Sequence, residues 1–302
     1  MQKTKKYFLQ MLGAAGVATC LILFLINPSF PTPDKILFFL VFVFMIFKQA
    51  TVMLRRLLPF VAVLLVYESF RGFADELGAQ VNFTLAPAAD ELLFGGLPTT
   101  YLQNLLWTGS VSWYDFVFYG AYLLHFILPI ALVILIWKTR PKHYWRSVAS
   151  FTIVAFAAFV TYFLIPAAPP WMAAEQGYIA PITRISSEVW GAFGLQDFPS
   201  LYNSISPNPV AAIPSLHAAW ATLISIIVLR LYGGRWGLFS AIYPVLIFIG
   251  TVYQGEHYVF DVILGVIYAA AGYYLTYYAV NLLQARKTYR RKALRLKTAK
   301  AH

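Results

Sequence analysis

The chain alternates apolar runs with polar connections, and the lengths of the runs predict membrane-spanning helices. Eight apolar runs stand out, at residues 7–26, 36–47, 57–70, 116–137, 148–165, 210–229, 237–253 and 258–283. A helix needs about 20 apolar residues to cross a bilayer. The runs at 36–47 and 57–70 are shorter, so they predict either two tilted spans or a pair that dips into the bilayer and returns. The pattern therefore predicts an all-α, polytopic membrane helix bundle with eight or six transmembrane helices.

Two long polar connections divide these runs into blocks. Residues 72–115 and 166–209 are rich in Pro, Trp and Tyr, which is typical of loops at a membrane interface. The predicted blocks are N-terminal transmembrane helices in 1–71, an outer interfacial loop in 72–115, a membrane core carrying the candidate chemistry in 116–283 and a basic tail in 284–302. Within the first loop, residues 90–103 mix acidic and apolar side chains, and they predict an amphipathic segment that anchors the loop or roofs a site.

Composition supports the membrane class. Of the 302 residues, 60% are hydrophobic and 12% are charged, whereas soluble domains contain about 45–50% and about 25%. These values exclude an ordinary soluble domain. The single cysteine, Cys20, excludes an intramolecular disulfide and a paired-cysteine metal site within this chain. Because the apolar run continues beyond Cys20 to Ile26, we interpret it as a span rather than a cleaved signal peptide.

Charged residues separate onto the two sides of the predicted spans. With a cytoplasmic N-terminus, 20 of the 23 basic residues lie on the inner side, eight of them in the tail. Only Lys35, Arg71 and Arg184 lie on the outer side, where all 12 acidic residues also fall, in loops or near span ends. This is a positive-inside pattern, so both termini are predicted to be cytoplasmic. The net charge of +11 then indicates how the protein is oriented in the membrane and does not indicate a nucleic-acid-binding surface.

Candidate chemical groups gather at the predicted outer ends of two spans. His217 stands at the start of one span, and His257 and Asp261 stand at the start of the last one. Ionisable residues inside a membrane segment are costly, which makes them functional candidates. His257 and Asp261 are four residues apart, so they share a helix face and the carboxylate can fix the imidazole tautomer. Two imidazoles at one site favour a mechanism with one as nucleophile and the other as acid.

Other interpretations of these residues stay open at this point. Each histidine could instead form a hydrogen bond to a neighbouring loop at the interface. A zinc site is a further competitor, although no cysteine or local histidine pair accompanies these residues. His125, inside the run 116–137, is a candidate for packing or for lining the site. Ser215 precedes a predicted helix, where it can be an N-cap and where backbone N–H groups favour a phosphate.

These motifs resemble the type 2 phosphatidic acid phosphatase superfamily. The Pro-Ser-Leu-His segment at 214–217 is similar to its Pro-Ser-Gly-His signature, and residues 257–261 are similar to its His-x3-Asp signature. Residues 166–171 and 208–219 resemble the inositol phosphorylceramide synthase (aureobasidin-resistance protein) branch, in which Leu commonly replaces the Gly. The resemblance covers about residues 116–283. It implies that His257 forms a phosphohistidine, that Asp261 orients it and that His217 protonates the leaving alkoxide, with no metal or other cofactor.

The chain departs from typical members of that superfamily at the phosphate-binding cations. A Lys-x6-Arg-Pro segment is absent, and Gly250 and Thr251 stand where a Ser-Arg pair would precede the nucleophile. The loss of these cations favours a phosphodiester substrate over a dianionic phosphate monoester. Arg71, at the end of an apolar run, is the leading replacement unless it pairs with a nearby carboxylate, and Arg184 is a weaker one.

The sequence thus predicts a membrane enzyme that moves a phosphoryl-headgroup, of the inositol phosphate kind, from a phospholipid donor to a lipid hydroxyl acceptor. Its site would face the non-cytoplasmic side of a membrane, most simply a prokaryotic plasma membrane. In the first alternative, a lipid-phosphate phosphatase, water replaces the acceptor at the same histidines. The second alternative is a lipid transporter or scramblase, for which matched halves with polar groups at mid-bilayer are expected. The polar residues here gather at one face instead, and no internal repeat is evident.

Overall fold

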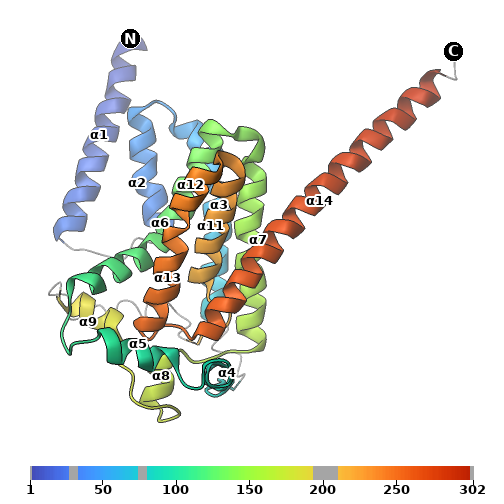
Figure 1. Ribbon diagram of the computed structural model, residues 1–302. Helices are drawn as coiled ribbons and strands as arrows, with labels where there is room; N and C mark the ends of the chain where they lie inside the picture. Colours follow the sequence, from blue (N-terminus) through green and yellow to red (C-terminus); the bar gives the residue numbers. More distant parts are fainter. Residues whose placement is uncertain (1, 27–32, 74–79, 193–209, 300–302) are drawn as a thin grey trace.

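The computed structural model describes residues 2–26, 33–73, 80–192 and 210–299, and in these ranges the chain is mainly helical (Figure 1). In chain order the elements are α1 (Gln2–Ile26), α2 (Pro33–Ile46), α3 (Ala50–Phe73), α4 (Leu85–Phe94), α5 (Pro98–Leu106), α6 (Trp113–Thr139), the 3-10 turn η1 (Pro141–His143), α7 (Tyr144–Leu164), α8 (Pro170–Glu175), α9 (Ile185–Ala192), α11 (Leu216–Tyr232), α12 (Gly234–Ser240), α13 (Ile242–Tyr253) and α14 (Val259–Ala299). The predicted all-α bundle is confirmed.

Each of the eight apolar runs contains a helix. In the described residues, five stretches are long and apolar enough to cross a membrane, namely Tyr7–Ile26, Trp113–Thr139, Pro141–Leu164, Gly234–Tyr253 and Val259–Ala279. Two shorter apolar helices, Ile36–Ile46 and Leu216–Tyr232, accompany them. Large apolar side chains also remain exposed along these helices, which is how a bilayer-facing surface differs from a soluble one. The chain is therefore an integral membrane protein.

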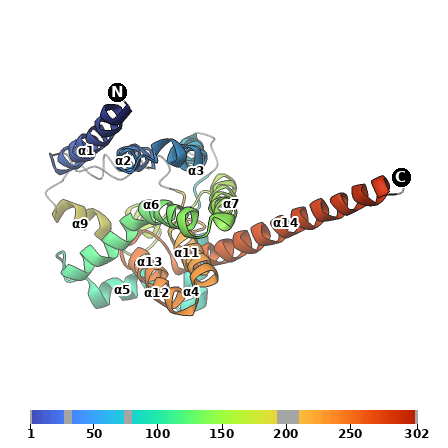
Figure 2. The same cartoon turned by 90° about the horizontal axis from the view of Figure 1, so that it is seen from above.

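The two short runs near the N-terminus form a helical hairpin. α2 ends at Ile46 and α3 begins at Ala50, so α3 starts before the predicted run 57–70 and includes Arg55 and Arg56. A tight turn joins the helices, with Lys48 at φ 58° and the Gln49 N–H donating to the Phe44 carbonyl oxygen at 2.8 Å. Seen from above, α1, α2 and α3 lie in a row beside the other helices (Figure 2). A hairpin leaves the orientation of all later helices unchanged.

α11 is the central helix of the bundle. It packs against α6, α7, α13 and α14, and its buried residues Trp220, Leu223 and Ile227 belong to the largest apolar cluster. α14 starts at the same end as α11 and approaches it closely. A Cβ atom at Gly265 would lie only 2.4 Å from the Ser215 carbonyl oxygen. The first turns of the two helices therefore lie side by side.

Three predicted boundaries differ from those in the structure. α11 begins at Leu216 and not at 210, because Pro214 disfavours helical backbone before it and Ser215 supplies the N-cap. The predicted span 237–253 is divided at Ala241 into α12 and α13. The last helix continues through the predicted basic tail to Ala299, and Figure 1 shows it extending well past the other helices.

Both predicted interfacial loops contain short helices that lie across one end of the bundle. α4 and α5 come from the first loop, and α8 and α9 from the second (Figure 1). Isolated β-bridges join Asn82 to Ala167 and Ala167 to Ala211. In this contact the Asn82 N–H donates to the Pro166 carbonyl oxygen, and the Ala167 N–H donates to that of Val210, both at 2.8 Å. The two loops are thereby attached to the segment that enters α11.

The close approach of α11 and α14 predicts that Gly265→Ala is destabilising. The added methyl group would meet the rigid backbone at Ser215, and overpacking of this kind costs about 1–3 kcal/mol. Gly120→Ala in α6 is the matched control, because nothing lies within 4 Å of a Cβ at Gly120. We expect a lower thermal midpoint in detergent for Gly265→Ala and an unchanged or higher one for Gly120→Ala. Equal midpoints for the two variants would contradict the packing.

Candidate active site

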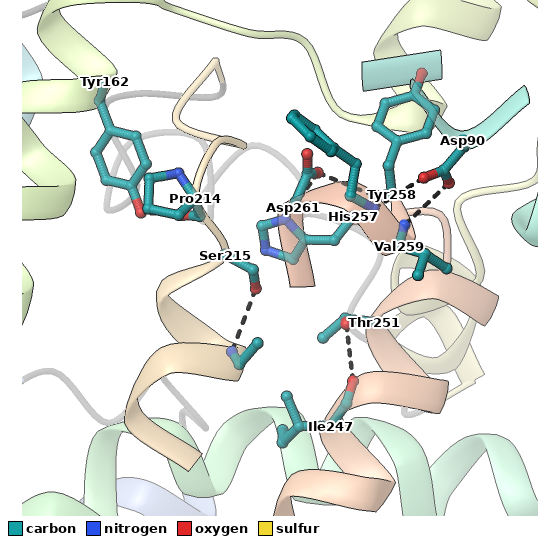
Figure 3. A network of polar contacts seen from close by, with 12 residues as sticks. Asp90, Tyr162, Pro214, Ser215, Ile247, Thr251, His257, Tyr258, Val259 and Asp261 are labelled. Atoms are coloured by element: carbon teal, nitrogen blue, oxygen red, sulfur yellow. Dashed lines mark hydrogen bonds and ion pairs between the residues drawn. The ribbon is translucent and has the colours of Figure 1, made fainter. Parts of the chain in front are cut away.

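The structure brings the three candidate catalytic residues together at the end of the bundle that the interfacial helices cover. His217 lies in the first turn of α11, His257 in the turn before α14, and Asp261 in the first turn of α14. The ring centroids of the two histidines are 5.8 Å apart. His257 Nδ1 lies 3.4 Å from Asp261 Oδ2, and the two side chains are 8% and 0% exposed (Figure 3). This geometry leaves His257 Nε2 as the nitrogen that does not face the carboxylate.

Two carboxylates cap the N-terminus of α14. Asp261 Oδ2 accepts a hydrogen bond from the Tyr258 N–H at 2.9 Å, and Asp90 of α4 accepts from the Val259 and Phe260 N–H groups at 3.0 and 2.8 Å (Figure 3). The first N–H groups of a helix have no partner inside the helix, and its positive end favours anions. Asp90 is fully buried. Its burial raises the pKa of the Asp90 carboxyl, whereas the N–H groups of Phe260 and Val259 act to lower that pKa.

The turn that carries His257 is closed by its own backbone. The N–H groups of Glu256 and His257 both donate to the Thr251 carbonyl oxygen, at 3.0 and 3.1 Å. Gly255 has φ 79°, a left-handed conformation that glycine adopts without strain. A Cβ atom there would also lie 3.1 Å from the Thr183 carbonyl oxygen of the second loop. Gly255 therefore permits both the turn and its close contact with that loop.

Gln103 of α5 connects this turn to the second interfacial loop. Its Nε2 donates to the carbonyl oxygens of Thr183 and Tyr253, at 2.7 and 2.9 Å. Its Oε1 accepts from the Thr183 N–H at 3.0 Å. The side chain is 8% exposed, so these bonds form away from water. The expected amphipathic segment 90–103 thus lies over the site, and its first and last residues, Asp90 and Gln103, are both buried.

An ion pair holds Arg184 beside the same turn. Its Nε lies 2.9 Å from Glu256 Oε1, and its guanidinium carbon lies 4.1 Å from the Trp171 ring centroid. Ser186 Oγ donates to the same Glu256 oxygen. Burial alone would raise the pKa of Glu256, but the Arg184 charge and the hydrogen bonds from Arg184 and Ser186 outweigh it and hold that pKa below its usual value. Glu256, the neighbour of His257 in the chain, therefore holds the Arg184 guanidinium beside the turn that carries His257.

The remaining candidates are Ser215 and Arg71. Ser215 is the N-cap of α11, where its Oγ accepts from the Ala218 N–H at 3.3 Å. Its own N–H donates to the Asp261 carbonyl oxygen at 3.0 Å, which joins the starts of the two helices. Tyr162 of α7 donates to the Pro214 carbonyl oxygen at 2.8 Å and steadies this segment (Figure 3). Arg71 belongs to the end of α3, but its side chain lies outside the described part of the structure.

α6 supplies an aromatic wall for His217. The His217 ring stacks on Tyr122 with centroids 4.1 Å apart, and it lies 4.2 Å from the ring of His125. His125 in turn stacks on Trp220 at 4.6 Å and is 5% exposed. His125 therefore packs directly against the candidate acid. In the described ranges, no three His, Cys, Asp or Glu side chains are grouped so that they could hold a metal ion.

The supporting residues were not predicted from the sequence. Asp90 and Gln103 act from a loop that is far away in the sequence, and Glu256 lies just outside the motif at 257–261. The available signal was weak, because it consisted of single polar residues next to apolar ones. No local sequence pattern connects Asp90 to residues 259 and 260, because they follow it by 169 and 170 positions.

An apolar groove lies between α13 and α14. Its volume is about 430 Å³, and Val252 and Val259 line the end next to the His257 turn. Val266 and Ile267 line it farther along α14. Ile263 and Ile267 are 40% and 53% exposed, so the groove opens on the outer surface of the bundle. In a membrane that surface is in contact with lipid.

Comparison with known proteins connects this geometry to a family. The model of the PAP2 superfamily matches residues 91–275, which include all three candidate catalytic residues. The phosphoinositol dihydroceramide synthase of Bacteroides thetaiotaomicron is 35% identical to the chain over 170 residues, which make up 52% of this chain and 54% of the relative. The match thus spans about half the length of that relative. No solved structure matches the chain.

The capping of α14 predicts that Asp90→Ala lowers stability. The change leaves two partly buried N–H groups without an acceptor, and loss of an N-cap alone costs about 0.5–2 kcal/mol. Glu91→Ala is the matched control, since Glu91 is the exposed neighbour on the same helix. We expect the thermal midpoint of Asp90→Ala in detergent to fall well below that of Glu91→Ala. If the two midpoints coincide, Asp90 is not a cap of α14.

Proposed function

The chain belongs to the PAP2 superfamily, the type 2 phosphatidic acid phosphatase superfamily that its histidine motifs resemble, and we propose that it is a membrane lipid phosphotransferase. It moves a phosphoryl-headgroup of the phosphoinositol kind from a phospholipid donor to the hydroxyl group of a ceramide-like lipid. The proposal rests on one observation. The ring of His217 lies opposite that of His257, and the Asp261 carboxylate faces Nδ1 of His257. The name of the Bacteroides relative supports the choice of headgroup and acceptor.

In the first step His257 attacks the phosphorus of the donor. Asp261 faces Nδ1, so it holds the proton on that nitrogen and leaves Nε2 as the nucleophile. The Nε2–phosphorus bond forms as the bond between phosphorus and the diacylglycerol oxygen breaks. His217 gives its proton to that oxygen. The products are free diacylglycerol and a phosphohistidine that still carries the headgroup.

In the second step the acceptor hydroxyl attacks the phosphohistidine. His217, now neutral, takes the hydroxyl proton, and the nitrogen–phosphorus bond breaks. His257 is restored, His217 is protonated again, and the new lipid is a phosphodiester. With water as the acceptor the same two histidines would complete a hydrolysis, which is the lipid-phosphate phosphatase alternative.

The charge of the site supports a phosphodiester substrate. The N-terminus of α11, with Ser215 as its cap, offers backbone N–H groups and the positive end of a helix dipole. Arg184, which Glu256 and Trp171 hold in place, supplies a guanidinium group beside the turn of His257. Thr251 stands where most of the superfamily would have a second cation. One cation suits the single charge of a diester better than the double charge of a monoester.

The groove between α13 and α14 is suited to an acyl chain of the donor. It begins beside the His257 turn, so a lipid whose phosphate reaches His257 would place a tail there. From Val259 to Ile267 the groove follows α14 for about 12 Å, at ~1.5 Å per residue. Its lining side chains are apolar, and its outer side is open. A donor can therefore enter from the bilayer without leaving it.

The charge distribution supports a site at the non-cytoplasmic face of a membrane, and we place it in a prokaryotic plasma membrane. Of the 23 basic residues, 20 fall on the side away from the histidines when the eight helices alternate in direction. The interfacial helices α4, α5, α8 and α9 would then lie at the outer surface and cover the site.

Removal of either histidine is expected to abolish transfer. Purified protein in vesicles that contain phosphatidylinositol and dihydroceramide should form a new phosphodiester lipid, detected by mass spectrometry. His257→Ala and His217→Ala should form none while keeping the wild-type gel-filtration profile. Asp261→Asn should lower the rate by about 10²-fold or more, because the nucleophile loses its oriented tautomer. Near-normal product from either alanine variant would overturn the mechanism, and free phosphate released from a lipid monoester would favour the phosphatase.

Filling the groove is expected to weaken binding of long-chain donors. Val266→Phe places a ring in the middle of the groove, whereas Val245→Phe adds the same ring to an exposed position of α13 outside it. We expect the KM for a diacyl donor to rise about tenfold for Val266→Phe only, which corresponds to ~1.4 kcal/mol. The KM for a short-chain, water-soluble donor should stay unchanged in both variants. Equal effects of the two variants would show that the groove does not hold the chain.

A further inference from the structure

A second polar pocket lies at the end of the bundle opposite to the histidines. It is enclosed by the start of α7, the end of α11 and the middle of α14, and its volume is about 210 Å³. The side chains of His143, Arg146, Arg230, Tyr273 and Tyr277 line it, together with two serines. None of its lining residues is acidic. The pocket therefore combines positive charge with hydroxyl groups and has no negative charge of its own.

The chain cannot neutralise this charge locally. α7 and α11 contain no Asp or Glu, and α14 contains none after Asp261 in its first turn. Among the described residues, neither Arg146 nor Arg230 takes part in an ion pair. A cation that is partly removed from water without a partner is costly. An anion from outside the chain would remove that cost.

Arg146 is the residue best prepared to receive such an anion. Its guanidinium carbon lies 3.7 Å from the Tyr277 ring centroid and 5.8 Å from that of Tyr273, so the group is held between α7 and α14. Its Nη2 atom is buried and has no hydrogen-bond partner among the described residues. Ser147 donates its hydroxyl proton to the His143 carbonyl oxygen of η1 at 3.1 Å, and Ser150 donates to the Arg146 carbonyl oxygen of α7 at 3.0 Å. The arginine N–H groups are therefore the strongest donors left in the pocket.

The surroundings of the pocket match the depth of lipid headgroups. Trp145, Tyr274 and Tyr278 are 50%, 56% and 65% exposed near it, and Tyr277 is 46% exposed. Exposed Trp and Tyr side chains are typical of the boundary between the bilayer and water. Basic pockets between transmembrane helices at the cytoplasmic boundary are suited to anionic lipid headgroups. The position thus favours a lipid over a soluble anion.

We propose that this pocket binds the phosphate group of an anionic phospholipid in the leaflet opposite to the histidine site. The planar guanidinium of Arg146 donates to two phosphate oxygens, and Arg230 closes the pocket from the side of α11. The tyrosine hydroxyl groups donate to the remaining oxygens, and the acyl chains lie along the exposed apolar side chains of α7 and α14. This site is separate from the histidines and does not depend on the reaction proposed for them.

The test uses the full chain, purified in detergent and delipidated. Phosphatidylglycerol, phosphatidylcholine or inorganic phosphate is added, retained lipid is counted by native mass spectrometry, and the thermal midpoint is recorded. We expect phosphatidylglycerol to remain bound and to raise the midpoint, and phosphatidylcholine to do neither. Arg146→Gln and Arg230→Gln should each reduce retention of phosphatidylglycerol about tenfold, or ~1.4 kcal/mol. Arg235→Gln, at an exposed arginine of the same end outside the pocket, should behave as wild type.

Two results would overturn the proposal. One is wild-type retention of phosphatidylglycerol by both Arg146→Gln and Arg230→Gln. The other is an equal rise of the midpoint with inorganic phosphate alone, which would identify a soluble anion as the ligand. Arg230 is exposed, so its substitution tests the pocket even if Arg146→Gln fails to fold. Arg146→Lys adds a further test, because it keeps the charge and loses the planar pair of donors.

Discussion

The buried N-terminus of α14 is the constraint on which the rest of the site depends. The first N–H groups of α14 are buried or partly buried beside α4, and each buried one left without an acceptor costs ~1–3 kcal/mol. Asp261 and Asp90 supply these acceptors. The same bonds set Asp261 beside His257 and fasten α4 over the site. One local requirement of the backbone therefore organises residues from two distant parts of the chain, α4 and the start of α14.

The two histidines share a frame because α11 and α14 start from a common junction. The Ser215 N–H donates to the Asp261 carbonyl oxygen, and Gly265 lets the helices approach one turn farther along. A relative shift of either helix would change the separation of the imidazole rings. A two-histidine mechanism needs both rings at one phosphorus atom, so the stability of this junction and the proposed activity are linked.

The sequence predicted those parts of the molecule that rest on local patterns. Apolar runs predicted the helices, and the spacing of His257 and Asp261 predicted their shared face. Arg184 was named as a possible cation, but its pairing with Glu256 was not, because the partners are 72 positions apart. Asp90 and Gln103 were missed for the same reason. The start of α11 was placed too early, since hydropathy does not register the backbone limits imposed by Pro214.

The sideways opening of the α13–α14 groove has a kinetic consequence for the proposed function. A donor that arrives through it diffuses in two dimensions, so the quantity that governs encounters is its mole fraction in one leaflet and not its bulk molarity. Inert lipid would act as a diluent even when the total amount of donor is constant. The reaction velocity would then report the composition of the membrane around the protein, which couples this chemistry directly to the lipid balance of the cell.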